Sequence, residues 1–294
     1  MIKELIDLIS ANIIGNKFKI KISVATILSG GHILIEDLPG TGKTTFAKSL
    51  TNAMNLKFKR IQFTSDLLPS DIIGYTFLKN NEFVINKGPI FTNIVLADEL
   101  NRASPKTQSA FLESMEEKTV TIDKDTFNLP IPFSVIATQN PSDLSGTSLL
   151  PESQLDRFTI SFSLEELSKD QRIELLKNEI NNNSIKSNFS YDQTIKDISQ
   201  ININDSVIEY LDNVSQFIKN NFNNIHISPR CLKQTISLSK SLSYLNSNKY
   251  VTYQEIKDVL PYILRHRLNI VEKKEFIEFM KNEVLKKVPL PDEK

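Results

Sequence analysis

Short, dense runs of apolar residues alternate, over the first half of the chain, with segments whose apolar residues recur at helical spacing. The predicted strands are residues 32–36, 58–63, 93–97, 133–138 and 158–162. The predicted helices are residues 2–10, 18–28, 44–54 and 105–117. Dense apolar strands suit a parallel sheet covered on both faces, and their alternation with helices predicts a doubly wound α/β fold.

After Ser163 the pattern changes, and only helical spacing remains. The predicted helices are residues 169–180, 205–222, 228–245, 252–268 and 275–287, and a polar connection runs from residue 181 to Tyr191. The change of pattern divides the chain into an α/β domain, residues 1–163, and a smaller all-α domain, residues 164–294.

Two hairpins are predicted inside the α/β domain. One spans residues 75–85 and turns at Asn80 and Asn81; the other spans residues 119–129 and turns near residues 123–125. Asparagine and aspartate tolerate the left-handed backbone of a tight turn. The pattern alone leaves open that both hairpins are surface decoration.

A glycine-containing loop joins the first predicted strand to the next helix. Its glycines let backbone N–H groups approach phosphate oxygens, and the helix N-terminus adds partial positive charge. Lys43 is predicted to reach the β- and γ-phosphates and Thr44 to bind Mg²⁺. The general pattern has glycine in place of Asp37, so a chance Gly-Lys-Thr turn is the alternative, although the flanking strand and helix favour a nucleotide loop. The candidate contacts are Pro39, Gly40, Thr41, Gly42, Lys43, Thr44 and Thr45.

Polar residues follow two later strands. Asp98 and Glu99 come directly after the apolar run at residues 94–97, and Asn140 follows the strand at residues 133–138. Ligands of open α/β sheets lie at the carboxyl ends of the strands. We therefore predict that Asp98 holds Mg²⁺, directly or through water, that Glu99 polarises the attacking water, and that Asn140 contacts the γ-phosphate or the water. A helix cap at Asp98 and a simple turn residue before Pro141 are the alternatives.

Composition narrows the classes of function. The 294 residues carry 35 Lys and Arg against 35 Asp and Glu, so we do not expect a protein built mainly to coat duplex DNA. The single cysteine, Cys231, excludes an internal disulfide, and His32, His226 and His266 are too scattered to favour a metal site. No apolar run approaches the ~20 residues of a membrane span, and the first ten residues do not resemble a secretory signal. We expect a cytoplasmic protein.

These residues, taken together, resemble the MoxR family of AAA+ ATPases over nearly the whole chain. Asp37 is the usual variant in that family's nucleotide loop. Ser153 and residues 147–149 depart mildly from its pattern, and residues 181–204 match weakly. The matching segments are residues 14–16, 32–44, 60–64, 66–74, 88–91, 93–103, 105–117, 150–158, 228–230 and 264–268.

The resemblance implies an AAA+ core with a five-stranded parallel sheet, followed by a helical lid at residues 164–294. It makes the glycine loop the Walker A motif and the acidic pair the Walker B motif, and it implies ATP and Mg²⁺ as cofactors. The further roles that it implies are the adenine side for Ile14 and Gly15, sensor 1 for Asn140, sensor 2 for Arg230, and an arginine finger supplied to a neighbouring subunit for Arg157, with Arg102 as a second candidate at the interface.

The family resemblance also implies a ring, usually of six subunits, in which the two hairpins lie near the pore. The implied function is an ATP-hydrolysing chaperone that remodels or activates partner proteins, with von Willebrand A domain proteins as typical partners. A nucleic-acid motor on the same fold is the alternative. It is disfavoured because the hairpins carry Glu82, Asp123 and Asp125 beside their lysines. A nucleotide-operated switch without turnover is disfavoured by the presence of Glu99, Asn140 and Arg157.

Overall fold

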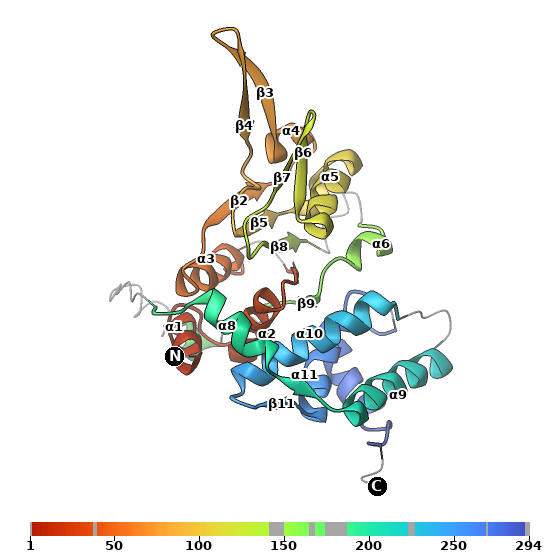
Figure 1. The fold of residues 1–294 in the computed structure, drawn as a ribbon. Coiled ribbons are helices and arrows are strands. Elements are labelled where there is room, and N and C mark those ends of the chain that lie inside the picture. Colours follow the sequence, from red (N-terminus) through yellow and green to blue (C-terminus); the bar gives the residue numbers. More distant parts are fainter. Residues whose placement is uncertain are drawn as a thin grey trace.

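A parallel five-stranded sheet forms the centre of the molecule (Figure 1). The computed structural model describes residues 2–37, 40–140, 150–164, 168–173, 187–222, 227–268 and 270–291. The strands lie in the order β2-β5-β8-β1-β9, and each pairs in parallel with its neighbours. Their bounds are Ile33–Glu36 (β1), Phe58–Gln62 (β2), Ile94–Asp98 (β5), Ser134–Gln139 (β8) and Ile160–Phe162 (β9). The predicted α/β class and its five-stranded sheet are confirmed.

The sheet is covered on both faces, as the dense apolar strands predicted. Leu34, Val95 and Val135 point to one face and pack in a core with α5 (Pro105–Glu117). Their neighbours on each strand point to the other face, where a second core contains residues of α1, α2 and α3 and of the helices after residue 187. These three helices span Ile2–Asn12 (α1), Lys17–Leu28 (α2) and Lys43–Ala53 (α3).

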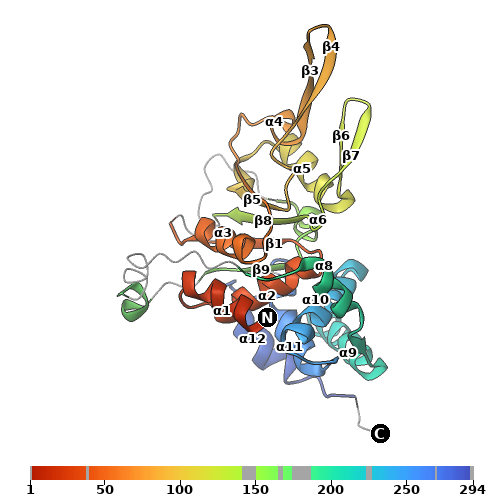
Figure 2. The ribbon, with the colours of Figure 1, turned by 60° about the vertical axis from the view of Figure 1, so that its left-hand side comes forward.

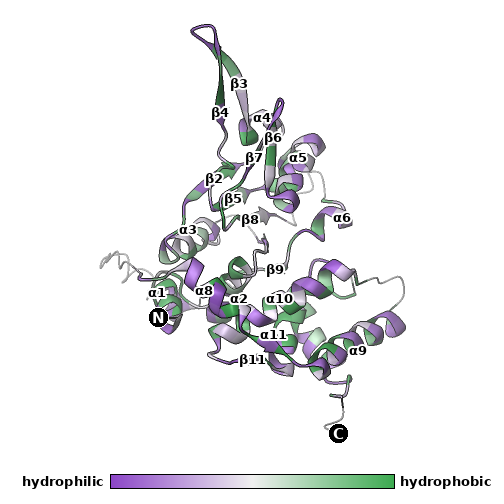
Figure 3. Cartoon of the chain, viewed as in Figure 1, coloured by the Kyte–Doolittle hydropathy of each residue, from purple (hydrophilic) through white to green (hydrophobic). Residues whose placement is uncertain are grey.

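The two predicted hairpins are present and lie on the same side of the sheet (Figures 1 and 2). Asn80 and Asn81 have φ values of 51° and 65°, and Asp123 has 53°, so left-handed residues close both turns. Figure 3 shows that apolar residues continue along the first hairpin, where Phe83 is 81% exposed. The strands are Gly74–Lys79 (β3) paired with Glu82–Lys87 (β4), and Thr119–Ile122 (β6) paired with Asp125–Asn128 (β7).

Helices dominate the chain after residue 187, as predicted. Ser228 begins α10 by accepting a hydrogen bond from the Cys231 backbone N–H, and Thr252 forms a capping box with Glu255 at the start of α11. None of the helices in the described ranges is both long and apolar enough to cross a membrane. The helices are Tyr191–Ser199 (α8), Asp205–Asn221 (α9), Pro229–Leu245 (α10), Tyr253–Leu264 (α11), Phe276–Phe279 (α12) and the π-helix Met280–Leu285 (η2).

Three details of the second half differ from the prediction. It is not free of strands, because β10 (Asn202–Ile203) pairs in parallel with β11 (Tyr250–Val251). Such two-residue strands are too short to leave a periodic signal. The predicted helix at residues 275–287 is divided between α12 and η2, and α8 was not predicted. Of the predicted helix at 169–180, the described residues reach only 173, and these are helical from residue 169.

Three short helices connect the longer elements of the α/β part of the chain. Helix α4 precedes hairpin β3–β4, η1 precedes helix α5, and α6 precedes β9. Their bounds are Pro69–Ile73 (α4), Leu100–Arg102 (η1) and Glu152–Leu155 (α6). The division of the chain at residue 163 stays a prediction, since the core on one face of the sheet contains residues from both sides of that boundary.

Candidate functional site

The loop between β1 and α3 has the backbone that its glycines were predicted to supply. Gly40 and Gly42 have φ values of 84° and 86°, a conformation that L side chains rarely adopt. The helix begins at Lys43, whose Nζ donates a hydrogen bond to the backbone oxygen of Asp37 at 3.3 Å. The Asp37 carboxylate accepts one from the Leu164 backbone N–H at 3.0 Å. The aspartate thus anchors the start of the loop to the segment that follows β9.

The Asp98 carboxylate lies at the end of β5 and is held from two sides. Arg60 of β2 approaches one of its oxygens at 2.6 Å, and the Thr138 hydroxyl of β8 donates a hydrogen bond to the other at 2.7 Å. The parallel register places Gln62 beside Asp98 and so brings the ends of β2 and β5 together. Asp98 is 9% exposed, and its charge is balanced by a cation rather than by bulk water.

Glu99 turns away from the strand with a left-handed backbone, φ 57°. Its N–H donates a hydrogen bond to the Thr138 hydroxyl at 2.9 Å. Its carboxylate accepts hydrogen bonds from Gln62 at 2.8 Å and from Arg102 at 3.0 Å. Arg102, predicted as a candidate for the subunit interface, therefore contacts Glu99 of its own chain.

These groups line one cavity of about 410 Å³ at the carboxyl ends of the strands. The structure thus brings together predicted residues from three separate segments of the sequence. Thr44 and Asp98 both lie there, and a hydroxyl and a carboxylate oxygen are the kind of ligands that Mg²⁺ takes in nucleotide sites. The lining residues are Gly40, Gly42, Lys43, Thr44, Arg60, Gln62, Asp98, Glu99, Thr138, Gln139 and Asn140.

Sequence reasoning missed four of these lining residues, namely Arg60, Gln62, Thr138 and Gln139. A signal for the first two was present, because Arg60 and Gln62 stand at alternate positions of a predicted strand and so share one of its faces. The positions of Thr138 and Gln139 follow from the β1–β8 register, which pairs Gln139 with Glu36.

Several predicted residues do not line this cavity. Thr41 belongs to the loop and Thr45 to the first turn of α3, but neither lines the cavity. Ile14 is 8% exposed, and Gly15, with φ 73°, lies against the side chain of Gln171. Pro39 lies outside the described residues. The predicted adenine-side role of residues 14 and 15 therefore stays a prediction.

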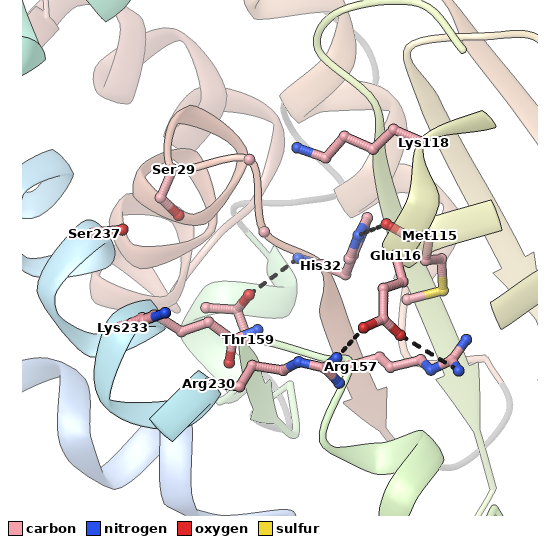
Figure 4. A pocket seen from close by; sticks show the side chains of 13 residues that line it. Ser29, His32, Met115, Glu116, Lys118, Arg157, Thr159, Arg230, Lys233 and Ser237 are labelled. Carbon is pink, nitrogen blue, oxygen red and sulfur yellow. Dashed lines mark hydrogen bonds and ion pairs between the residues drawn. The ribbon is translucent and has the colours of Figure 1, made fainter. Parts of the chain in front are cut away.

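Arg157 and Arg230 lie together elsewhere, around the carboxylate of Glu116 at the end of α5 (Figure 4). Arg157 approaches one carboxylate oxygen of Glu116 at 3.4 Å, and Arg230 pairs with the other. They line a cavity of about 430 Å³ that also contains Lys118 and Lys233. None of its lining residues belongs to the cavity at the phosphate loop. The four predicted catalytic residues thus lie in two cavities, with Glu99 and Asn140 at the phosphate loop and Arg157 and Arg230 in the second cavity.

The floor of this second cavity contains His32, which is buried in neutral form. Its Nδ1 accepts a hydrogen bond from the Val135 N–H at 3.0 Å, and its Nε2 donates one to the Met115 carbonyl at 3.1 Å. Burial lowers the pKa of His32 to about 4. The imidazole thus ties β1 and β8 to the end of α5, one residue before Glu116.

Two other residues left without a role by the sequence are buried. Burial lowers the pKa of His266 well below its ordinary value, and its Nε2 donates a hydrogen bond to the Phe158 carbonyl at 3.0 Å. Burial raises the pKa of the Cys231 thiol to about 11, so the reactive thiolate is not formed near neutral pH. His226 lies outside the described residues.

The strand order, the glycine loop that opens α3, the acidic end of β5 and the helical lid define a P-loop ATPase of the AAA+ class. The model of the ATPase family associated with various cellular activities (AAA) matches residues 32–160, and the AAA lid domain model matches residues 218–287. The chain is 33% identical to the chaperone MoxR1 of Mycobacterium tuberculosis over 95% of its own length and 79% of that protein. It belongs to the MoxR family.

Two further relatives resemble the chain over nearly its whole length. The uncharacterized protein YeaC of Bacillus subtilis is 35% identical over 99% of this chain and 95% of its own. A crystal structure described as a "putative ATPase" from Cytophaga hutchinsonii superposes with a TM-score of 0.88 at 35% identity, over 99% of this chain and 95% of that one. The fold described above is therefore shared by a solved structure.

Proposed function

We propose that this protein hydrolyses ATP within a homo-oligomeric ring, hexameric as is usual in the family, and uses the energy to remodel or activate partner proteins. The observation that carries the proposal is the convergence of Lys43, Thr44, Asp98, Glu99 and Asn140 on one cavity. These are the groups that phosphoryl transfer to water requires: a cation for the phosphates, ligands for Mg²⁺, and a carboxylate that can orient a water.

In this proposal the residues of the loop bind the phosphates. The backbone N–H groups at the start of α3 and the Lys43 ammonium contact the β- and γ-phosphate oxygens. Thr44 and Asp98 hold Mg²⁺, which neutralises charge on the same phosphates. Arg60, paired with Asp98 at 2.6 Å, orients that carboxylate.

Glu99 is proposed to accept a proton from, or align, the attacking water. Its carboxylate already has two partners, Gln62 and Arg102. Both partners lie on its own chain and hold the carboxylate at the rim of the cavity. Asn140, at the exit of β8, is proposed to contact the γ-phosphate or the same water.

Arg157 and Arg230 are proposed to act on the nucleotide of a neighbouring subunit. Both lie in a cavity separate from that of their own phosphate loop, and both are charged groups paired with a single carboxylate. A phosphate offered by a neighbour would find two guanidinium groups close together, the arrangement that stabilises charge in the transition state of phosphoryl transfer. We therefore propose that Arg230, the sensor 2 residue, acts in the neighbour's site beside the finger Arg157.

The partner-directed role rests on the family. One relative is named a chaperone. We propose that the client carries, or acts through, a von Willebrand A domain, and that the protein works in the cytoplasm. Hairpins β3–β4 and β6–β7 would face the ring's pore, and the exposed Phe83 offers apolar surface for a client segment.

The proposal is tested by mixing two inactive variants. Lys43→Ala subunits bind ATP poorly, and Arg157→Ala subunits lack the finger. An interface that pairs the nucleotide site of the Arg157→Ala subunit with the finger of the Lys43→Ala subunit is complete. Mixed rings should therefore regain part of the phosphate release that each parent lacks. Mixing must be shown by co-purification on a tag carried by one variant. Mixed rings that stay as inactive as the parents would contradict the shared site.

A further inference from the structure

The turn that follows α11 contains three buried side chains in a row. The Arg265 side chain is 4% exposed and that of Arg267 is 8% exposed, while the residue His266 is 3% exposed. Buried guanidinium groups are rare unless each donor finds a partner. Besides partners in the helical part of the chain, the two arginines have partners in two different parts of the α/β domain.

Arg265 contacts the strand that leads into the phosphate loop. Its Nη1 lies 2.5 Å from a carboxylate oxygen of Glu36, the last residue of β1, and its Nη2 donates a hydrogen bond to Ser163 at 2.9 Å. The Ser163 hydroxyl in turn donates to the Glu36 carbonyl at 2.8 Å. Gln139, which lines the phosphate cavity, donates to the Glu36 carboxylate at 2.8 Å. Arg265 thus belongs to the support of the protomer's own nucleotide site.

Arg267 contacts the segment that carries the finger. It binds the Asp156 carboxylate at 2.8 Å, the Asp156 carbonyl at 3.0 Å and the Phe158 carbonyl at 2.7 Å. His266 donates a second hydrogen bond to the Phe158 carbonyl. The carbonyls immediately before and after Arg157 are therefore both bound by this turn, and the backbone of the finger is fixed.

The same network reaches the second arginine of the pair. Arg267 donates a hydrogen bond to the Gln234 side chain of α10 at 2.7 Å, one turn of helix beyond Arg230. Asp156 also accepts a hydrogen bond from Ser228, the residue that caps α10, at 3.2 Å. Because a guanidinium presents its donors in a rigid fork, one side chain can set the position of both the finger segment and the start of α10.

Among the described contacts of Arg157, only Glu116 meets its guanidinium. Its Nε and Nη1 are buried and lack a hydrogen-bond partner among the described residues. The finger is thus placed by its backbone and by the turn beneath it more than by contacts of its own side chain. Glu116 is partly exposed, and Arg157 and Arg230 share its carboxylate. A phosphate from a neighbouring subunit can therefore replace Glu116 as their partner.

We propose that the turn at residues 265–267 is a two-armed positioning element, in which Arg265 supports the protomer's own phosphate loop and Arg267 holds Arg157 and Arg230 in place for the neighbour's nucleotide. This inference rests on the proposed function, because it requires that Arg157 acts in trans. It predicts that the same substitution at two positions only two residues apart impairs opposite sides of the subunit interface.

Arginine-to-lysine substitutions test the proposal, because they keep the charge and remove the fork. In unmixed rings, Arg267→Lys should lower kcat at least tenfold while the affinity for a fluorescent ATP analogue stays within twofold of the parent. Arg265→Lys, the matched control on the same turn, should instead weaken that affinity at least fivefold and raise KM. Thermal unfolding of each variant is recorded, since loss of the fold would lower both quantities together.

Mixed rings then assign each arm to its side. Arg267→Lys should recover phosphate release with Lys43→Ala, which supplies an intact finger, and should not recover with Arg157→Ala. Arg265→Lys should show the reverse pattern, recovering with Arg157→Ala only. If Arg267→Lys does not assemble, Asp156→Asn replaces it, with the same expected pattern, since that change removes the carboxylate that Arg267 binds.

The outcomes separate this inference from the function on which it rests. Failure of the Lys43→Ala and Arg157→Ala pair to recover would reject the shared site and this proposal with it. A second outcome is that the Lys43→Ala and Arg157→Ala pair recovers phosphate release, while Arg265→Lys and Arg267→Lys behave alike, recovering with both partners or with neither. That result would leave the shared site in place and overturn the positioning role of the turn.

Discussion

Glu99 has an unusual backbone for its residue type. Its φ of 57° lies in the left-handed region, which costs a non-glycine residue on the order of 1 kcal/mol or more. The conformation persists because Thr138 accepts the Glu99 N–H and Gln62 donates to the carboxylate. The Glu99 side chain lines the cavity, where we propose that it acts on the attacking water.

The Glu99→Gln variant should therefore separate binding from chemistry. Glutamine keeps the shape of the side chain and its ability to accept a hydrogen bond, but it lacks the charge that polarises water. We expect nucleotide affinity within a factor of about three of the parent and a turnover reduced by about 10²–10⁴. Phosphate release and nucleotide titration measure the two quantities.

A matched control is available on α5, where Glu113 is exposed. Glu113→Gln removes one carboxylate from the surface and should leave turnover near the parent value. Hydrolysis by Glu99→Gln at the rate of this control would reject the role given to Glu99.

At the scale of elements, the end of α5 is tied to the sheet by His32. The neutral imidazole bridges Val135 of β8 and Met115 of α5. Protonation of His32 would therefore disturb the contact between β8 and α5. Because burial lowers its pKa to about 4, the folded protein excludes a proton that the unfolded chain binds below about pH 6.5.

The free energy of unfolding should therefore decrease as the pH is lowered. The contribution of His32 to stability is complete above pH 6.5 and is lost as the pH falls from there toward 4, by an amount of about 3 kcal/mol. Urea unfolding at pH 7.5 and pH 4.5 measures the change. His32→Asn, which keeps an acceptor near Nδ1, should lose stability at both pH values but show a smaller difference between them. An equal difference in the two proteins would show that the acid sensitivity arises elsewhere.

The two hairpins illustrate how local and global information divide. The turn of the first was predicted from Asn80 and Asn81, whose left-handed conformations need only neighbouring residues. The residue pattern alone did not indicate that both hairpins would lie on one side of the sheet, far from the lid (Figure 2). Only the family resemblance implied a shared position, near the pore of a ring. That placement depends on where β2, β5 and α5 lie.

At the scale of the whole molecule, balanced charge argues against a nucleic-acid motor. The chain carries as many acidic as basic residues, and the first hairpin offers apolar rather than cationic surface, as Phe83 and Leu78 show. A protein that follows a phosphate backbone needs a connected basic track.

We therefore expect weak binding to single-stranded and duplex DNA, with a dissociation constant in the range of non-specific binding, about 10⁻⁴–10⁻⁶ M at physiological salt. We also expect no stimulation of ATP hydrolysis by either. Fluorescence anisotropy at several salt concentrations, with ATP present, tests the first statement, and phosphate release tests the second. Tight binding with a steep salt dependence would favour the nucleic-acid motor.

The sequence by itself determined the features that depend on neighbours in the chain. The glycine loop opening a helix at Lys43, the acidic pair ending an apolar run, and the change from strand to helical spacing near Ser163 are contiguous patterns, and each has a local physical cause. They sufficed for the fold class and the family. The adenine-side, sensor and finger assignments came from the family resemblance and are still predictions.

Only the tertiary structure decided which distant residues meet. Glu116 and Arg230 are 114 positions apart, and Arg265 and Glu36 are 229 apart, so no local pattern could pair them. The pairing of β2 with β5 brings the Arg60 side chain to the Asp98 carboxylate. The fold of the lid brings Arg267 to the carbonyls on either side of Arg157. A buried charge requires a partner but does not specify which one, and the choice is made by the packing of the elements that carry them.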